Sequence, residues 1–90
     1  MSKQGEQDIQ RFQQLLDEQH AWPAPYTFKF IVPEAELERL KALFGQIPVT
    51  VRPSRKGRYM SVTVDMLIHS SDEIVSIYTQ AGKIPGLIAL

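Results

Sequence analysis

The sequence predicts an α+β fold: a four-stranded antiparallel sheet with two helices on one face, preceded by an N-terminal helix. From residue 26 onward, segments in which apolar residues alternate are interleaved with segments in which they recur every three or four positions, in the order β-α-β-β-α-β. Each predicted strand is also apolar on one side only, whereas the strands of a doubly wound sheet are apolar on both sides. These two observations predict a ferredoxin-like plait, in which right-handed crossovers place the first and third strands at the centre.

Residues 1–25 are predicted to form a separate segment, with the ferredoxin-like domain in residues 26–90. Residues 6–19 have the spacing of an amphipathic helix, and its narrow apolar stripe consists of Ile9, Phe12, Leu15 and Leu16. This helix must pack against another element, because a helix of this length is marginally stable alone. The sequence A-W-P-A-P at residues 21–25 is a stiff connector, since proline lacks the N–H that a continuing helix needs.

The first strand and the helix that follows it are predicted from two changes of period. Residues 26–32 alternate as a strand does, and their inward side carries Tyr26, Phe28, Phe30 and Val32. Pro33 suits the first position of the next helix, where a missing N–H has no intrahelical partner. The apolar stripe of that helix consists of Leu37, Leu40 and Phe44. Gly45 is predicted to end the helix.

The second and third strands are predicted to form a hairpin. The second strand covers residues 47–53, and the run R-K-G-R at residues 55–58 forms the turn, with Gly57 supplying a positive φ. A long alternation from Tyr59 predicts the third strand, whose inward side carries Met60, Val62, Val64, Met66 and Ile68.

The last helix and strand complete the plait. A capping box opens the helix, with Ser70 as the cap and Glu73 three residues later. The apolar side of this helix consists of Ile74, Ile77, Tyr78 and Ala81. Gly82 is predicted to end the helix in a left-handed conformation, and G-L-I-A-L at residues 86–90 is predicted to form the fourth strand.

A plait with both helices on one side leaves the other side of its sheet uncovered, and we call that side the open face. The residues of the two central strands on the open face are Thr27, Lys29, Ile31, Ser61, Thr63, Asp65 and Leu67. This mixture is too polar for an obligate hydrophobic interface, and a few exposed apolar residues are normal on a protein surface. Two alternatives follow: the face is solvated, or it is covered by the N-terminal helix or by a second chain, which would give a homodimer.

Composition and charge exclude several classes of function. The chain has no cysteine, which excludes disulfides, thiolate nucleophiles and cysteine-ligated zinc. The formal net charge is zero, so no overall electrostatic field favours a nucleic acid or a membrane. The first ten residues contain no apolar run, and no later segment approaches the roughly 20 apolar residues of a membrane span. We therefore expect a cytoplasmic protein.

The sequence contains no recognisable arrangement of catalytic or metal-ligating residues. The only histidines, His20 and His69, stand near the ends of predicted elements without a neighbouring nucleophile. Serines such as Ser70 and Ser71 are explained by the start of a helix. The prediction is therefore no enzymatic activity, no metal and no cofactor.

The charge is unevenly distributed, because residues 49–60 contain four cations and no acid. We take this hairpin as the candidate contact element for a partner protein or an anion, and its site residues are Arg52, Ser54, Arg55, Lys56, Gly57, Arg58 and Tyr59. A Walker-type phosphate loop is excluded, since it needs two glycines followed by Lys-Ser or Lys-Thr at the opening of a helix. An RNA-recognition motif is disfavoured, because Arg58 and Met60 occupy the positions of its two stacking aromatic residues. Two alternatives stay open: the basic residues only keep an exposed hairpin soluble, or they bind single-stranded nucleic acid weakly through its backbone.

Three stretches of the sequence have a specific resemblance. They are P-S-R-K-G-R-Y-M-S-V-T-V at residues 53–64, Y-T-Q-A-G-K-I-P-G-L-I-A-L at residues 78–90, and L-L-D ahead of P-A-P-Y-T. Over nearly the whole chain, from Leu15 to Leu90, they resemble the YbeD-like family of small bacterial proteins, a domain of unknown function. The matching residues are Pro53, Ser54, Lys56, Gly57, Tyr59 and Ser61, with Gly82 and Lys83 in the closing turn.

The resemblance implies a cytosolic ferredoxin-like domain, similar to the ACT-type regulatory domains that sense amino acids. ACT domains typically admit the amino acid at a glycine-containing loop after the first strand, whereas this loop is Val32-Pro33-Glu34 and has no glycine. This difference disfavours amino-acid binding at that loop. The predicted function is a non-enzymatic regulatory or protein-interaction module that contacts another protein through residues 52–59. The alternatives are an amino-acid-sensing ACT-like domain and a weak binder of single-stranded nucleic acid.

Overall fold

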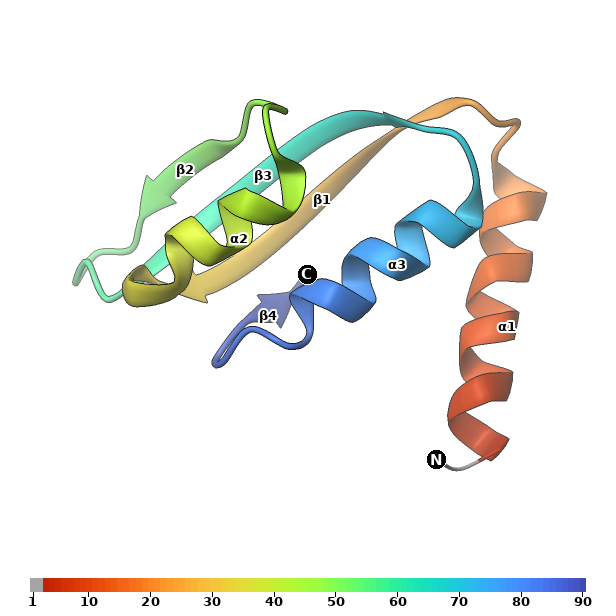
Figure 1. Ribbon diagram of the computed structural model, residues 1–90, viewed down its shortest axis with the longest axis horizontal. Helices are drawn as coiled ribbons and strands as arrows, with labels where there is room; N and C mark the ends of the chain where they lie inside the picture. Colours follow the sequence, from red (N-terminus) through yellow and green to blue (C-terminus); the bar gives the residue numbers. More distant parts are fainter. Residues whose placement is uncertain (1–2) are drawn as a thin grey trace.

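The computed structural model describes residues 3–90, with side chains from Gln7 onward, so the first two residues of the predicted N-terminal segment lie outside the described residues. It is an α+β fold with one four-stranded antiparallel sheet in the order β2-β3-β1-β4 (Figure 1). The helices are α1 (Lys3–Gln19), α2 (Leu37–Phe44) and α3 (Ser71–Ala81), with a short 3₁₀ turn, η1 (Glu34–Glu36), before α2. The strands are β1 (Ala24–Pro33), β2 (Thr50–Pro53), β3 (Tyr59–Ile68) and β4 (Ile88–Ala89). The predicted ferredoxin-like plait is confirmed, with the first and third strands at the centre.

The pairing of β1 with β3 determines which side chains lie on each face of the sheet. The two strands are aligned from Ala24 opposite Ile68 to Pro33 opposite Tyr59. Directly paired residues point to the same face, so the predicted inward residues of the two strands gather on one side. Phe28, Phe30, Val32, Val62, Val64 and Ile68 are fully buried there, and Met60 and Met66 are partly buried against the same core.

An aromatic cluster joins the sheet to both helices of the plait. The ring centroid of Phe28 lies 5.9 Å from that of Phe44 on α2 and 5.3 Å from that of Tyr78 on α3. The ring of Phe30 lies 6.2 Å and 6.0 Å from the same two rings. Because two neighbouring residues of one strand face contact both helices, α2 and α3 must cover the same side of the sheet (Figure 1).

Tyr78 gives this core a pH dependence that can be measured. Burial raises the pKa of the Tyr78 hydroxyl above its usual value of 10.0, and the hydrogen bond with the hydroxyl of Tyr26, 3.2 Å away, adds to the effect. A raised pKa means that the folded protein favours the protonated phenol, so this stabilisation is complete below about pH 10. The free energy of unfolding should therefore fall as the pH rises above about 10.

The variant Tyr78→Phe should remove most of that fall, because it keeps the buried ring and removes the ionisable hydroxyl. Urea unfolding of both proteins between about pH 8 and 11.5 would measure the difference in slope. Tyr59→Phe is the matched control, since the ring of Tyr59 is well exposed. A slope that is equally steep in the wild type and in Tyr78→Phe would contradict the prediction.

The helix termini confirm two predicted features and correct one. Ser70 Oγ accepts a hydrogen bond from the N–H of Glu73 at 3.4 Å, while Glu73 Oε1 accepts one from the N–H of His69 rather than from that of Ser70. Gly45, with φ of 58°, ends α2 as expected. The prediction for Gly82 is wrong: its φ is −63°, and the left-handed residue is Gly86, with φ of 75°.

The left-handed residue is Gly86 rather than Gly82 because the side chain of Ile84 packs in the core. The N–H of Gly82 still donates to the carbonyl of Tyr78, and the N–H of Ile84 donates to the carbonyl of Ala81. These bonds keep the chain turning in the right-handed sense for a further turn, which places the side chain of Ile84 in the core. The chain can then reverse only at Gly86, immediately before β4.

Several predicted boundaries also move. β1 begins at Ala24 rather than at residue 26, so its first two residues come from the predicted connector, and β4 covers Ile88–Ala89 rather than residues 86–90. Pro33 is the last residue of β1 rather than the first residue of a helix, and η1 comes between it and α2. The second strand starts at Thr50 rather than at residue 47. Ile47 and Val49 still pack against the core as predicted from their apolar character, although no ladder hydrogen bonds hold them.

The N-terminal helix packs beside α3 and leaves the open face uncovered (Figure 1). Leu16 is buried, and the ring of Phe12 contacts that of Tyr78 at a centroid distance of 6.1 Å. The side-chain amide of Gln13 donates to Asp72 at 2.7 Å and to Ser71 at 3.3 Å. Of the two coverings predicted for the open face, the N-terminal helix is therefore excluded. Within residues 3–90, no helix combines the length and the apolar character needed to cross a bilayer.

Candidate functional site

The predicted contact element is a hairpin closed at its base by three hydrogen bonds. The N–H of Ser54 donates to the carbonyl of Tyr59 at 2.8 Å, and the N–H of Tyr59 donates to Ser54 Oγ at 3.3 Å. The N–H of Gly57 donates to the carbonyl of Ser54 at 3.0 Å. Gly57 has φ of 70°, a conformation that other residues adopt only with strain, so the predicted role of this glycine in the turn is confirmed.

The four cations of the hairpin are accessible to solvent. Arg52, Arg55, Lys56 and Arg58 are exposed, and none of them belongs to an ion pair with a side chain that the structure describes. The carbonyl of Arg58 accepts a hydrogen bond from the N–H of Glu34, which ties the hairpin to the start of η1. The hairpin therefore presents positive charge from a backbone that is held on both sides.

A small apolar depression lies at the base of the hairpin, and we call it the hairpin hollow. It encloses about 110 Å³ and is lined by Ile31, Arg52, Pro53, Ser54, Tyr59, Met60 and Ser61. The side chain of Tyr59 is 45% exposed at its edge. Three of the seven predicted site residues, Arg52, Ser54 and Tyr59, line this hollow together with residues of the open face. The other four, Arg55, Lys56, Gly57 and Arg58, are in the turn and are not part of the lining.

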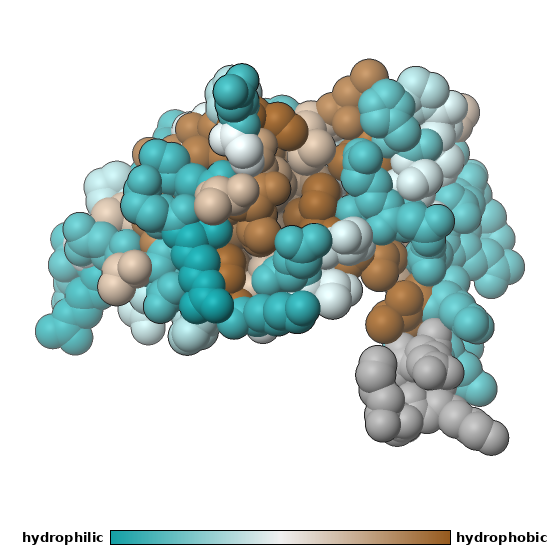
Figure 2. Space-filling model, viewed as in Figure 1, coloured by the Kyte–Doolittle hydropathy of each residue, from teal (hydrophilic) through white to brown (hydrophobic). Residues whose placement is uncertain are grey.

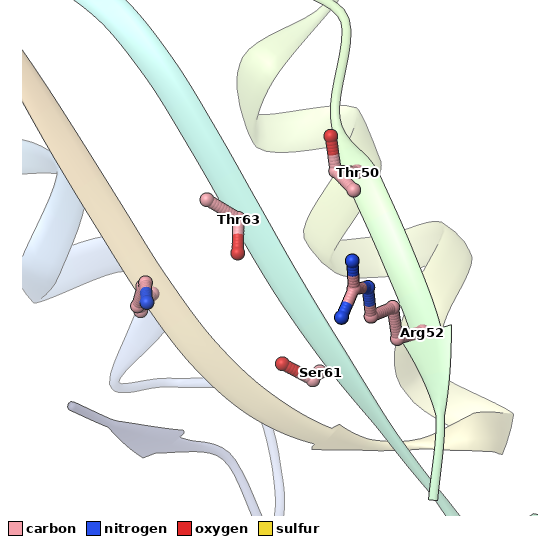
Figure 3. Close-up of a pocket in the computed structure, with 5 residues that line it drawn as sticks. Thr50, Arg52, Ser61 and Thr63 are labelled. Carbon is pink, nitrogen blue, oxygen red and sulfur yellow. The ribbon is translucent and has the colours of Figure 1, made fainter.

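A larger and more polar depression lies on the open face itself, and we call it the sheet hollow. It encloses about 360 Å³ and is lined by Lys29, Thr50, Arg52, Ser61 and Thr63. Its residues come from three adjacent strands, because Thr63 pairs with both Lys29 and Thr50, and Ser61 pairs with both Ile31 and Arg52. Figure 3 shows the guanidinium of Arg52 turned from β2 toward the hydroxyl-bearing side chains of β3.

The sheet hollow was not predicted from the sequence. Alternation places Lys29, Ser61 and Thr63 on the open face, but it assigns Arg52 to the hairpin and gives Thr50 no role. Only the register of β2 against β3 brings the two cations to opposite sides of the same hydroxyl groups. The available signal was a cation at an outward position on each of the two strands that flank β3.

The edge of the sheet near β4 carries apolar side chains on the open face. Ile88 pairs with Ile31, and the N–H of Leu90 donates to the carbonyl of Lys29 at 2.9 Å. Ile88 and Leu90 are 54% and 67% exposed, and Leu67 on β3 is 53% exposed. The open face is therefore a mixed surface, with apolar side chains around the polar sheet hollow.

The opposite side of the molecule differs in character. In Figure 2 apolar surface lies in the middle of the view, between α2 and α3, and hydrophilic side chains frame it. A depression of about 340 Å³ between these helices is lined by Arg39, Leu43, Gln80, Lys83 and Ile84. Arg39 is paired with Glu36 at 3.7 Å, so part of its charge is already compensated.

The two histidines have separate surroundings. His20 Nδ1 lies 3.0 Å from the carbonyl of Leu16 at the end of α1, and its ring stacks on Trp22 at a centroid distance of 5.1 Å. His69 is exposed between β3 and α3, and its N–H donates to the side chain of Glu73. In the part of the chain with described side chains, no three histidine, aspartate or glutamate residues lie close enough to hold a metal ion.

Comparison with known proteins places the chain in a family. Residues 17–90 match the family described as "Protein of unknown function (DUF493)". A UPF0250 protein of Shewanella sp. (strain ANA-3) is 33% identical over 79 residues, which is 80% of this chain and 90% of the relative. A UPF0250 protein of Shewanella putrefaciens is 30% identical over 84 residues, covering 86% of this chain and 91% of the relative.

No solved structure matches the chain. The relatives carry no enzymatic name, and the match confirms the resemblance to the YbeD-like family of small bacterial proteins. The chain belongs to the bacterial family of proteins of unknown function known as DUF493 or UPF0250.

Proposed function

We propose that this protein is a non-enzymatic interaction module that binds an acidic segment of another protein at the hairpin, residues 52–59, and at the adjoining hairpin hollow. The observation that carries the proposal is the combination of four exposed cations with an apolar hollow beside an exposed tyrosine. Tyrosine and arginine are enriched among the residues that dominate protein interfaces.

The chemistry of the hairpin favours a partner with one apolar anchor next to acidic residues. The hairpin hollow is large enough for part of one side chain, and its lining includes Ile31 and Tyr59. The cations around it would attract carboxylates and accelerate the encounter, because complementary charge raises association rates. Zero net charge on the whole chain makes this attraction local to the hairpin.

The backbone of the hairpin is already in place for binding. Hydrogen bonds from Ser54, Gly57 and Tyr59 close the turn, and the bond from Glu34 to Arg58 fixes it against η1. A surface that is ordered before binding loses less conformational entropy on association. These contacts support recognition by a preformed surface.

The double variant Lys56→Glu with Arg58→Glu is expected to abolish partner binding and to leave the melting temperature within a few degrees of the wild type. Both side chains are exposed, and substitutions at such positions usually cost less than about 0.5 kcal/mol each. The measurement is crosslinking in cells from a photoreactive amino acid placed at Tyr59, with the same amino acid at exposed Thr79 on α3 as a second position. Discrete adducts from position 59 that disappear in the double variant are the expected result.

The matched control is Arg39→Glu with Lys41→Glu, which makes the same change of charge on α2. It should keep the adducts from position 59, because α2 lies on the other side of the sheet from the open face (Figure 1). Adducts that persist in the hairpin variant, or that disappear equally in the α2 variant, would rule out the hairpin as the contact element.

Binding of single-stranded nucleic acid is the second candidate, and the four exposed cations of the hairpin favour it. It predicts an affinity that falls steeply between low and physiological salt, whereas an apolar anchor depends less on salt. A gel-shift titration at the two salt concentrations separates the candidates. An amino-acid site at the loop after β1 lacks support, since Pro33 has no N–H and the N–H of Glu34 is used by Arg58.

A further inference from the structure

We propose that the sheet hollow is a binding site for the phosphate group of a small phosphorylated ligand. Its lining consists of two cations, Lys29 and Arg52, and three hydroxyl side chains, Thr50, Ser61 and Thr63. Lys29 and Thr50 lie outside the hairpin, whereas Arg52 belongs to both sites, so the ligand would compete with the proposed protein partner for Arg52 and for the hairpin hollow.

The sheet itself builds the site. β3 lies between β1 and β2, and Lys29 is aligned with Thr63 whereas Arg52 is aligned with Ser61, two residues along the strand. Since adjacent strands are about 4.8 Å apart and residues rise about 3.4 Å along a strand, the backbones of Lys29 and Arg52 are separated by roughly 12 Å. Their long side chains rise on the two sides of Ser61 and Thr63, which are short and form the floor between them. Figure 3 shows the guanidinium of Arg52 turned from β2 toward the side of β3 that carries Ser61 and Thr63. A large residue at position 61 or 63 would fill the hollow.

No ion pair among the described side chains neutralises the positive charge of the site. The ion pairs among the described side chains are Arg39 with Glu36 and Lys41 with Glu38, and neither includes Lys29 or Arg52. Asp65 is the acid of β3 on the open face, but its carboxylate accepts a hydrogen bond from Thr27 Oγ1, two residue pairs further along the strands than Lys29 and Thr63. The hollow thus holds two cations without a carboxylate in its lining.

A phosphate monoester matches this arrangement better than a carboxylate does. It carries close to two negative charges, and its terminal oxygens accept hydrogen bonds from several directions. A carboxylate carries one charge, and its two oxygens lie in one plane. Arg52 offers a planar fork of donors and Lys29 offers three N–H groups from the other side, so donors approach from opposed directions.

The neighbouring hairpin hollow indicates what the phosphate would be attached to. The two hollows share Arg52 and Ser61, so a ligand bound in one continues directly into the other. The hairpin hollow is lined by Ile31 and by the exposed ring of Tyr59. The ligand class is therefore a phosphate monoester with an apolar or aromatic group close to its phosphate.

The test is a titration followed by ¹H–¹⁵N NMR at near-physiological ionic strength, with adenosine monophosphate as a phosphorylated aromatic probe. Shifts of backbone amide signals should concentrate at residues 29, 50–52 and 61–63 and should saturate at a dissociation constant on the order of 1 mM. Adenosine and succinate, which lack the phosphate, should each bind at least about tenfold more weakly. Equal binding of adenosine, or equal binding of succinate, would overturn the assignment to a phosphate.

Two double variants locate the site. Lys29→Gln with Arg52→Gln should weaken the binding of adenosine monophosphate at least about tenfold, because both charged donors are lost. Arg39→Gln with Lys83→Gln removes the same charges from the hollow between α2 and α3 and should change the affinity less than about twofold. All four positions are exposed, and a dispersed NMR spectrum verifies the fold of each variant. An equal loss in the two variants, or shifts confined to residues 55–58, would overturn the proposal.

A third variant, at Asp65, should raise the affinity for adenosine monophosphate, because it removes a negative charge close to the sheet hollow. Asp65→Asn removes the acid of the open face without changing the lining of the sheet hollow. Binding of adenosine monophosphate should then become about twofold to threefold tighter at low ionic strength. Unchanged or weaker binding in this variant would contradict an electrostatic site at this position.

Discussion

Replacing Phe28 with alanine is expected to lower the free energy of unfolding by about 3–5 kcal/mol. Phe28 is fully buried in β1, and its ring contacts the rings of Phe44 on α2 and Tyr78 on α3. Truncation therefore leaves a cavity bounded by the sheet and by two helices. Because the β1–β3 ladder fixes the backbone on one side, these elements cannot all move inward to close it.

The size of this effect matters because small domains are marginally stable. A chain of 90 residues is expected to have a free energy of unfolding of about 5–13 kcal/mol, so the variant could lose half of its stability. Urea unfolding measures the change, and Phe28→Leu, expected to cost less, keeps the comparison measurable if the alanine variant does not fold.

The matched control for this variant is Leu67→Ala on the neighbouring strand. Leu67 has a similar apolar character but lies on the open face and is 53% exposed, so its truncation should cost less than about 0.5 kcal/mol. Similar losses at positions 28 and 67 would mean that the two faces of the sheet are not distinguished in the way that the structure shows.

The division of the sheet into two faces could be predicted from the sequence because a strand has a period of two residues. The position of every inward residue of β1 and β3 follows from this period alone, and both strands are long enough to show it. The end of a helix, by contrast, also depends on packing that the sequence pattern does not show. Gly82 has the residue type of a left-handed cap, but the burial of Ile84 two residues later favours one more right-handed turn.

The position of α1 could not be predicted, and the reason is physical. An apolar stripe shows that a helix packs against something, but it does not identify the surface. The choice depends on the direction of the segment that joins α1 to β1, which is residues 20–23 in the structure. In the structure the contacts of Phe12 and Leu16 are made beside α3, and Leu15 on the same helix stays 48% exposed.

The hairpin and the sheet hollow also differ in how far each could be predicted from the sequence. The hairpin is local in sequence, so its glycine, its cations and its exposed tyrosine could be read together from residues 52–59. The sheet hollow combines residues from three strands, and its cations Lys29 and Arg52 are 23 positions apart in the chain. Alternation gives the face of each residue, whereas the register between strands, which brings these residues together, comes from the pairing.

The second large effect is expected at Gly86, where Gly86→Ala should lower the free energy of unfolding by about 2–5 kcal/mol. Gly86 has φ of 75°, a conformation that costs other residues about 1–2 kcal/mol. In addition, an added Cβ would lie 2.8 Å from Cγ of Pro33, and the proline ring has no free rotation with which to move away. Overpacking of this kind typically costs a further 1–3 kcal/mol or so.

Gly57→Ala separates the two contributions, because it shares the left-handed conformation without the close contact. Gly57 has φ of 70°, and no atom lies within 4 Å of an added Cβ, so its substitution should cost only about 1–2 kcal/mol. Thermal and urea unfolding of the two variants measure the difference, which is the part due to Pro33. The double variant Gly86→Ala with Pro33→Ala should recover that part, since alanine at position 33 has no Cγ. Equal losses at positions 57 and 86, with no recovery in the double variant, would mean that the close approach of Gly86 to Pro33 does not fix the reversal of the chain before β4.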